Sequence, residues 1–131
     1  MVKTLQSAMK TPIIGKIRQL DKYIWEHQTK PPKLIQRQVV EPMIKNIGEL
    51  YTYAIKELRG NVTMTNWKRF EELIIEIQSA AYRIYDLKGW NLKTSSVIDA
   101  FCDEIYKDLN KYHFANFKTN PIKSKDEDSK A

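Results

Sequence analysis

The sequence predicts an all-α protein built as an antiparallel four-helix bundle, and three observations support this fold class. Only four glycines and five prolines interrupt the 131 residues. Apolar residues recur at three- and four-residue steps along four segments, which is the spacing of amphipathic helices. No run alternates between apolar and polar residues for long enough to predict a strand. Connections of about four to eight residues make consecutive helices antiparallel neighbours.

The first helix is predicted to begin at Pro12. Thr11 has the side chain of an N-cap, and proline suits the first helical position because its missing N–H has no partner there. The helix must end before Pro31 and Pro32, which cannot continue it. The segment before it, residues 1–10, is predicted to be a flexible N-terminus.

A second, longer helix is predicted from Lys33 to Arg59, and Gly60 is a natural C-terminal stop. Pro42 lies inside this segment. Because proline removes a backbone hydrogen bond and its ring clashes with the carbonyl one turn earlier, we expect a kink or a break between Gln38 and Pro42.

The third helix is predicted to start around Thr65 or Asn66 and to end at Gly89. The fourth is predicted to start with Ser96, which stands three residues before Asp99 in a capping arrangement. The stripes of the second and third helices are wide, so surplus apolar surface on them is available for a subunit interface.

The C-terminal segment 115–131 is predicted to be a disordered tail, so the helical domain spans residues 11–114. From Lys118 onward, Lys, Ser, Asp and Pro dominate the sequence. Such a composition cannot bury enough apolar surface to fold.

Positive charge is concentrated in the first half of the chain. The whole sequence has a formal net charge of +6, yet residues 1–69 carry 13 basic and 5 acidic side chains, and residues 70–117 carry 5 and 8. A basic domain favours polyanionic partners, although many lysines and arginines of a helical protein serve only solubility. Six basic residues near helix ends are predicted to contact nucleic-acid phosphates: Lys30, Lys33, Arg37, Arg59, Lys68 and Arg69.

No catalytic or metal-binding constellation is predicted. Ser95 and Ser96 are interpreted as helix caps rather than nucleophiles, and Cys102 as a buried, inert core thiol. His27 and His113 fall near helix ends, where the dipole favours histidine. Two histidines and one cysteine far apart in the sequence do not make a structural zinc site. We therefore expect a protein that is not an enzyme and needs no cofactor or metal.

The sequence also predicts a cytoplasmic protein without membrane contact. Its longest stretch free of Lys, Arg, Asp and Glu is seven residues, whereas a membrane helix needs about 20 apolar residues. A single cysteine cannot form an internal disulfide, which fits a reducing compartment. Among the aromatic residues, helical spacing favours core positions for Tyr23, Trp25 and Trp67. Each of these three, and Trp90, has a ring that can stack on a base, and Trp90, just beyond Gly89, is the one that need not belong to a stripe.

Two segments of the chain resemble one family of small four-helix proteins. The first is Pro31, Pro32 and Lys33 opening a long helix that continues into the sequence LYTYAI at 50–55. The second is the third-helix end AYRIYDLK at 81–88, followed by a polar turn and a fourth helix. Both are similar to the proteins related to the accessory variability determinant of diversity-generating retroelements. That family includes proteins encoded in intervening sequences of bacterial 23S ribosomal RNA genes.

The fourth helix is similar to the family in part. Ile105, Leu109 and Tyr112 fall on its aliphatic and aromatic positions, but Tyr106 and Asn110 stand where glycines are usual. Membership implies a homo-oligomeric ring, commonly a pentamer, with a strongly basic surface. It implies a non-catalytic protein that binds a partner reverse transcriptase and its template RNA, and that supports the cDNA synthesis preceding mutagenic retrohoming. The six basic residues named above would then hold RNA phosphates.

A different class of function is also open at this stage. The alternative is a helical protein–protein interaction adaptor without nucleic-acid binding, whose apolar stripe receives a partner helix. In that case the positive charge serves solubility.

Overall fold

The computed structural model describes residues 4–60 and 63–119, with side chains described as far as residue 115. These residues are helical almost throughout, and the described ranges contain no strand, so the predicted all-α class is confirmed. The elements in chain order are α1 (Leu5–Met9), α2 (Pro12–His27), α3 (Lys33–Ile35), the π-helical segment η1 (Gln36–Val40), α4 (Glu41–Leu58), α5 (Met64–Asp86) and α6 (Leu92–Thr119).

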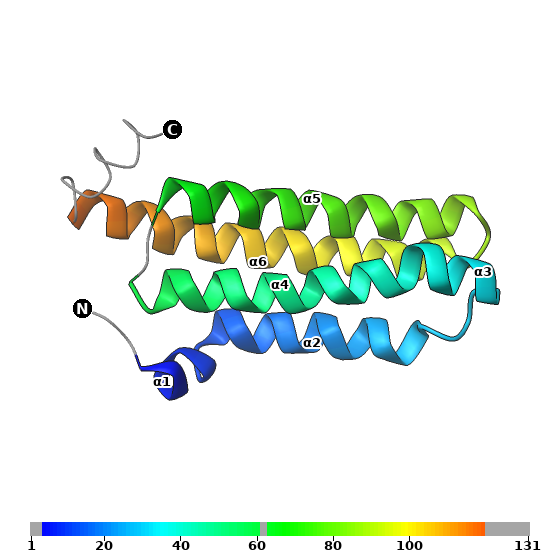
Figure 1. The fold of residues 1–131 in the computed structure, drawn as a ribbon, viewed down its shortest axis with the longest axis horizontal. Helices are drawn as coiled ribbons and strands as arrows, with labels where there is room; N and C mark the ends of the chain where they lie inside the picture. Colours follow the sequence, from blue (N-terminus) through cyan, green and yellow to red (C-terminus); the bar gives the residue numbers. More distant parts are fainter. Residues whose placement is uncertain (1–3, 61–62, 120–131) are drawn as a thin grey trace.

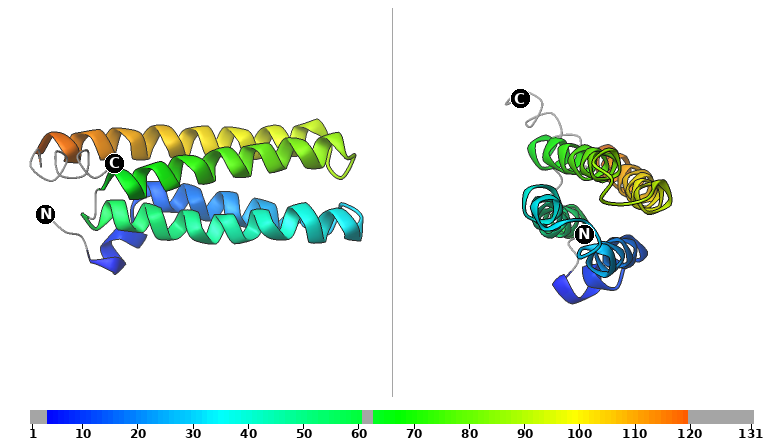
Figure 2. Two further views of the ribbon diagram at one scale, coloured as in Figure 1. Left: turned by 45° about the horizontal axis from the view of Figure 1, so that its top comes forward. Right: turned by 90° about the vertical axis from the view of Figure 1, so that its right-hand side faces the viewer.

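The long helices lie in two layers, with α2 beside α4 in one layer and α5 beside α6 in the other (Figures 1 and 2). Helix α2 contacts α4 and α6, and α5 contacts the same two helices. Consecutive long helices run in opposite directions (Figure 1). The short α1 packs against α2 and α4.

Each long helix contributes an apolar stripe to one core between the layers. Ile17, Leu50, Ile77 and Ile105, one from each helix, are fully buried. Burial of apolar surface contributes about 25 cal/mol per Å², so the stripes supply the main force that holds the layers together. None of the described helices combines the length and the apolarity needed to cross a membrane.

The predicted start of the first long helix is confirmed. Thr11 is the N-cap of α2, and its Oγ1 accepts a hydrogen bond from the Ile14 backbone N–H at 3.4 Å. Pro12 occupies the first helical position. The helix ends at His27, four residues before Pro31.

Pro42 neither breaks the second predicted helix nor leaves it a regular α-helix. Residues 33–58 are helical throughout, but the turn before the proline is π-helical. The Glu41 N–H donates to the Gln36 carbonyl, five residues earlier. This wider turn lies where the backbone must give room to the proline ring and where Pro42 offers no N–H. In place of the kink or break expected between Gln38 and Pro42, the helix therefore has one π-helical turn.

Helix α5 begins and ends earlier than predicted. Its N-cap is Thr63, whose Oγ1 accepts from the Asn66 N–H at 3.1 Å. Its last residue is Asp86, and the Lys88 and Gly89 N–H groups donate to carbonyls of the last turn. Lys88, not Gly89, takes the left-handed conformation, with φ 65°. The prediction assumed that the glycine would end the helix, whereas Gly89 is the residue after the turn.

Helix α6 begins at Leu92, four residues before the predicted cap at Ser96. The capping side chain is that of Asn91, whose Oδ1 accepts from the Thr94 N–H at 2.8 Å. Ser95 is buried inside the helix, and its Oγ donates to the Ala81 carbonyl at 2.7 Å. The interpretation of the two serines as caps is therefore wrong, because Asn91 performs that role one turn earlier.

The two chain ends also differ from their predicted state. Within the predicted flexible segment 1–10, residues Leu5–Met9 form α1, and Ala8 is fully buried. At the other end α6 continues to Thr119, past the predicted boundary at 114. Residues 1–3 and the tail 120–131 lie outside the described residues.

Cys102 is a core residue, as predicted. It is fully buried in α6, and its burial raises the pKa of the thiol, so the reactive thiolate is disfavoured.

A buried polar pair crosses the core near the end of α4. The Nδ1 of His113 lies 3.1 Å and 3.2 Å from the two carboxylate oxygens of Glu57, and both side chains are almost wholly excluded from solvent. The His113 ring stacks on Trp67 of α5, with centroids 4.3 Å apart. The pair thereby connects α4, α5 and α6. The sequence predicted that His113 lies near a helix end, but it did not predict the buried contact with Glu57.

Replacing one member of this pair is expected to destabilise the fold strongly. His113→Ala leaves the Glu57 carboxylate buried without this partner, which costs about 3–5 kcal/mol in the free energy of unfolding. The double variant Glu57→Met/His113→Phe replaces both groups with apolar side chains of similar size and is expected to be more stable than His113→Ala. Urea unfolding followed by circular dichroism measures both.

Lys111→Ala, an exposed change on the same helix, is the matched control and should alter stability by no more than about 0.5 kcal/mol. A double variant that is no more stable than His113→Ala would show that the unpaired buried carboxylate is not the source of the effect.

Candidate nucleic-acid interface

The six basic residues predicted to contact phosphates do not form one cluster. Lys30 and Lys33 lie at the end of the molecule where α2 connects to α3, and Arg37 follows one turn later (Figure 1). Arg59 directly follows α4 at the opposite end. Arg37 and Arg59 are 22 residues apart along one continuous helical segment, so they are separated by roughly 33 Å.

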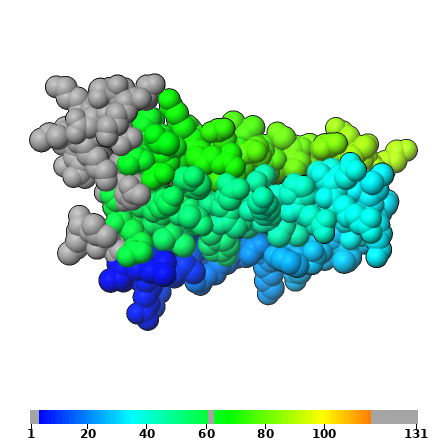
Figure 3. All heavy atoms as spheres, in the orientation of Figure 1, coloured from blue at the N-terminus to red at the C-terminus, as the bar shows by residue number. Residues whose placement is uncertain are grey.

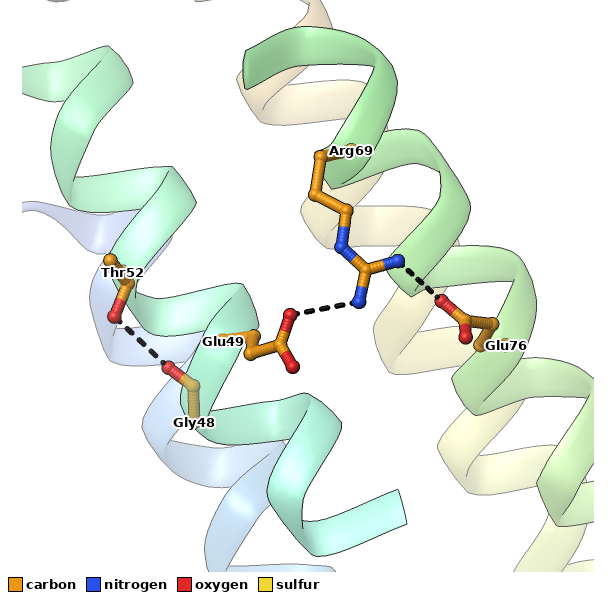
Figure 4. Close-up of polar contacts among 5 residues, drawn as sticks. All are labelled: Gly48, Glu49, Thr52, Arg69 and Glu76. Atoms are coloured by element: carbon orange, nitrogen blue, oxygen red, sulfur yellow. Dashed lines mark hydrogen bonds and ion pairs between the residues drawn. The ribbon is translucent and has the colours of Figure 1, made fainter. Parts of the chain in front are cut away.

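Arg69 is already engaged by two carboxylates. Its Nη2 lies 2.8 Å from Glu49 Oε2 on α4, and its Nη1 lies 3.0 Å from Glu76 Oε2 on α5 (Figure 4). The hydrogen bond to Glu49 is the main cause that raises the pKa of Arg69. A guanidinium held in this way serves the contact between α4 and α5, so Arg69 is a poor candidate for phosphate binding. Lys68, its exposed neighbour, is not held in this way.

The connection between α2 and α3 is fixed by two side chains. The Nε2 of Gln36 donates to the Thr29 carbonyl at 3.2 Å and to the Pro31 carbonyl at 2.6 Å. Trp90 lies between α5 and α6, and its indole N–H donates to the His27 carbonyl at 2.9 Å. These bonds hold the backbone that carries Lys30 in one position.

The turn between α5 and α6 lies against this connection. A Cβ added to Gly89 would come within 3.0 Å of Pro31 Cβ and 2.8 Å of Ile84 Cγ2, so the two chain segments approach as closely as a glycine allows. Lys88 in this turn and Lys93 at the start of α6 are both exposed. The two connections appear together in Figure 3, at the end of the molecule where α3 lies.

We call the resulting set of exposed basic residues the cationic end: Lys30, Lys33, Arg37, Lys88 and Lys93. None of the five forms an ion pair within the ranges that the structure describes. Asp86 is the acidic residue nearest to Lys88 in the sequence. Lysine supplies a mobile point charge and arginine a planar fork of donors, so this end can hold several phosphate groups.

Lys88 and Lys93 are not among the residues that the sequence predicts for this surface. Both follow the acidic third helix, in a half of the chain that carries no positive excess. The order of the helices could have indicated both residues. In a bundle of antiparallel helices the first and third connections lie at the same end, so the α5–α6 turn lies beside the α2–α3 connection.

The exposed tryptophan is Trp25 rather than Trp90. Trp90 is 5% exposed, and its indole N–H donates to the His27 carbonyl at the end of α2. Trp67 is buried against His113. Trp25, predicted as a core residue from its helical spacing, is 51% exposed.

Two grooves flank the exposed Ile75 on α5. One lies between α5 and the η1–α4 segment and has a volume of about 340 Å³, with Val39, Pro42 and Met43 among its lining residues. The other lies between α5 and α6 and has a volume of about 210 Å³. Among residues 4–60 and 63–119, no group of three or more histidine, cysteine and acidic side chains is arranged to hold a metal ion.

Comparison with protein-family models, curated proteins and solved structures finds no match to this chain.

The close contact between the two connections predicts opposite effects for two glycine substitutions. Gly89→Ala places a Cβ against Ile84 and Pro31 and is expected to lower the free energy of unfolding by about 1–3 kcal/mol. Gly48→Ala, in the middle of α4 where an added Cβ meets nothing within 4 Å, is expected to raise it by about 0.5–1 kcal/mol. Thermal and urea unfolding measure both changes. Equal effects of the two substitutions would contradict the tight contact at Gly89.

Proposed function

We propose that this protein is a non-catalytic RNA-binding accessory protein that holds the RNA backbone at its cationic end. The observation that carries the proposal is that five exposed basic residues lie on the α2–α3 connection, on the α5–α6 turn and on the helical turns next to them, at one end of the molecule. Hydrogen bonds from Gln36 and Trp90 hold the backbone of the α2–α3 connection that carries Lys30.

The proposed binding is electrostatic and independent of base sequence. Each phosphate that a lysine or arginine neutralises releases a counterion, so affinity falls steeply as salt rises. Elsewhere on the surface, carboxylates compete for the basic groups. The Nζ of Lys16 lies 2.6 Å from Asp108 Oδ2. The guanidinium of Arg69 pairs with both Glu49 and Glu76.

The biological role that we propose follows from the family that the sequence resembles. In this role the protein binds a partner reverse transcriptase and its template RNA, and it supports the cDNA synthesis of a diversity-generating retroelement during mutagenic retrohoming. The all-helical fold is compatible with the four-helix bundle of that family, and the cationic end supports contact with RNA.

We also propose that copies of the chain assemble into a homo-oligomeric ring, a pentamer if the family arrangement holds. Support comes from the groove beside Ile75, whose side chain is 61% exposed, and from the separation of charge between the two halves of the chain. A ring would repeat the cationic end in every subunit and so strengthen the field that an RNA meets.

Charge-removal variants test the RNA-binding surface. Lys33→Gln and Arg37→Gln are each expected to weaken binding of a short RNA and to reduce the slope of log K against log salt by roughly one. Arg69→Gln is the matched control and should leave the slope unchanged, because its guanidinium already pairs with Glu49 and Glu76. Fluorescence anisotropy at several salt concentrations measures these slopes.

Wild-type protein that binds no RNA at low salt would refute the function proposed. That result would favour the alternative, a helical protein–protein interaction adaptor. The specific observation behind this alternative is the 340 Å³ groove between α5 and the η1–α4 segment, which is lined in part by Val39, Met43 and Ile75.

The mass of the protein in solution tests the ring. Sedimentation equilibrium is expected to give a multiple of the 15.5 kDa chain mass, and Ile75→Glu is expected to lower it by placing a charge in the proposed contact. Lys107→Glu, an exposed change on α6, is the control. A wild-type monomer at all concentrations would contradict the ring while leaving RNA binding to be judged by its own experiment.

A further inference from the structure

We infer that Trp25 is a stacking platform for an unpaired base of the bound RNA, which makes the outward face of α2 part of the binding surface. This inference rests on the function proposed above. Of the three tryptophans, Trp67 and Trp90 are buried and Trp25 is half exposed. An indole that faces solvent on a helix costs apolar exposure, which a stacked base would remove.

Basic residues flank Trp25 along the same face of α2. Arg18, Lys22 and Trp25 are separated by four and then three residues, so their side chains lie above one another on one side of the helix. Arg18 and Lys22 are exposed. Lys30, the first residue of the cationic end, follows the C-terminus of the helix. A strand of RNA that leaves the cationic end along α2 therefore passes Trp25 before it reaches Lys22 and Arg18.

Asp21 lies one helical turn before Trp25, so its carboxylate is on the same side of α2 as the indole. Arg18 and Asp21 both act on Tyr51 of α4. Burial raises the Tyr51 pKa, the Asp21 carboxylate adds to that rise, and the Arg18 guanidinium opposes it.

The acidic neighbours of Trp25 specify which part of the RNA it receives. Asp21 and the exposed Glu26 repel a phosphate group at this point of the helix. A base is uncharged, and it is attracted to the indole ring through stacking. The arrangement thus favours phosphates at Lys22 and Lys30 and a base between them, which only a single strand can provide because a duplex keeps its bases stacked inside.

Trp25→Ala tests the inference with a fluorescein-labelled oligoadenylate and a duplex of the same length as probes. The affinity for the single strand is expected to fall about 5- to 30-fold, with the salt slope unchanged, since no phosphate contact is lost. Trp25→Phe is expected to retain most of the affinity. Binding of the duplex should be altered much less by either variant.

Two controls separate stacking from charge and from damage to the fold. Tyr85→Ala removes another exposed aromatic residue, on α5, and should leave the affinity for the single strand unchanged. Lys22→Gln should reduce the salt slope by roughly one, which the tryptophan variants do not. Quenching of tryptophan emission by the oligoadenylate should occur in the wild type and disappear in Trp25→Phe, since the two remaining tryptophans are buried.

Each possible result decides between the two proposals. Wild-type protein without RNA binding would refute the RNA-binding function. Wild-type binding that Trp25→Ala leaves unchanged would overturn the stacking inference alone. A drop in the solution mass of Trp25→Ala would assign the residue to a contact between copies of the chain and would also overturn it.

Discussion

The contact between the two connections at one end of the molecule determines where its surface charge gathers. Gly89 approaches Pro31 and Ile84 so closely that no side chain fits, and the Trp90 N–H bonds to the last carbonyl of α2. This contact joins the α2–α3 connection to the α5–α6 turn and brings lysines from both halves of the chain together.

Two further features connect this end of the molecule to the opposite end. The π-helical turn before Pro42 lets residues 33–58 continue as one helical segment that spans the length of α5 and α6. At the far end of that segment, Glu57 meets His113, and the histidine ring lies on Trp67. Removing two ionisable groups from water is costly, so this pair specifies how α4, α5 and α6 pack more than it adds stability.

The basic side chains on the surface are of two kinds. Some form ion pairs with a neighbouring helix, and others form none within the described residues. Arg69 and Lys16 each form an ion pair with a carboxylate of a neighbouring helix, so their charges serve contacts between helices. The cationic end has no such partner among the described residues, and Trp25 offers an apolar face along α2 beside it. A single-stranded nucleic acid offers charged phosphates and flat, uncharged bases side by side, and this complementarity is the reason that we propose it as the partner.

The sequence by itself determined the all-helical class, the start of α2 at Thr11 and Pro12, and the burial of Cys102. Each depends on local spacing or on capping within one helix. The tertiary structure decided that Arg69 is neutralised, that Lys88 and Lys93 join the cationic end, and that Trp25 rather than Trp90 is exposed. These properties depend on contacts between residues far apart in the chain. A helical stripe tells which side chains face inward, but only the packing of other helices decides how much of each one they cover.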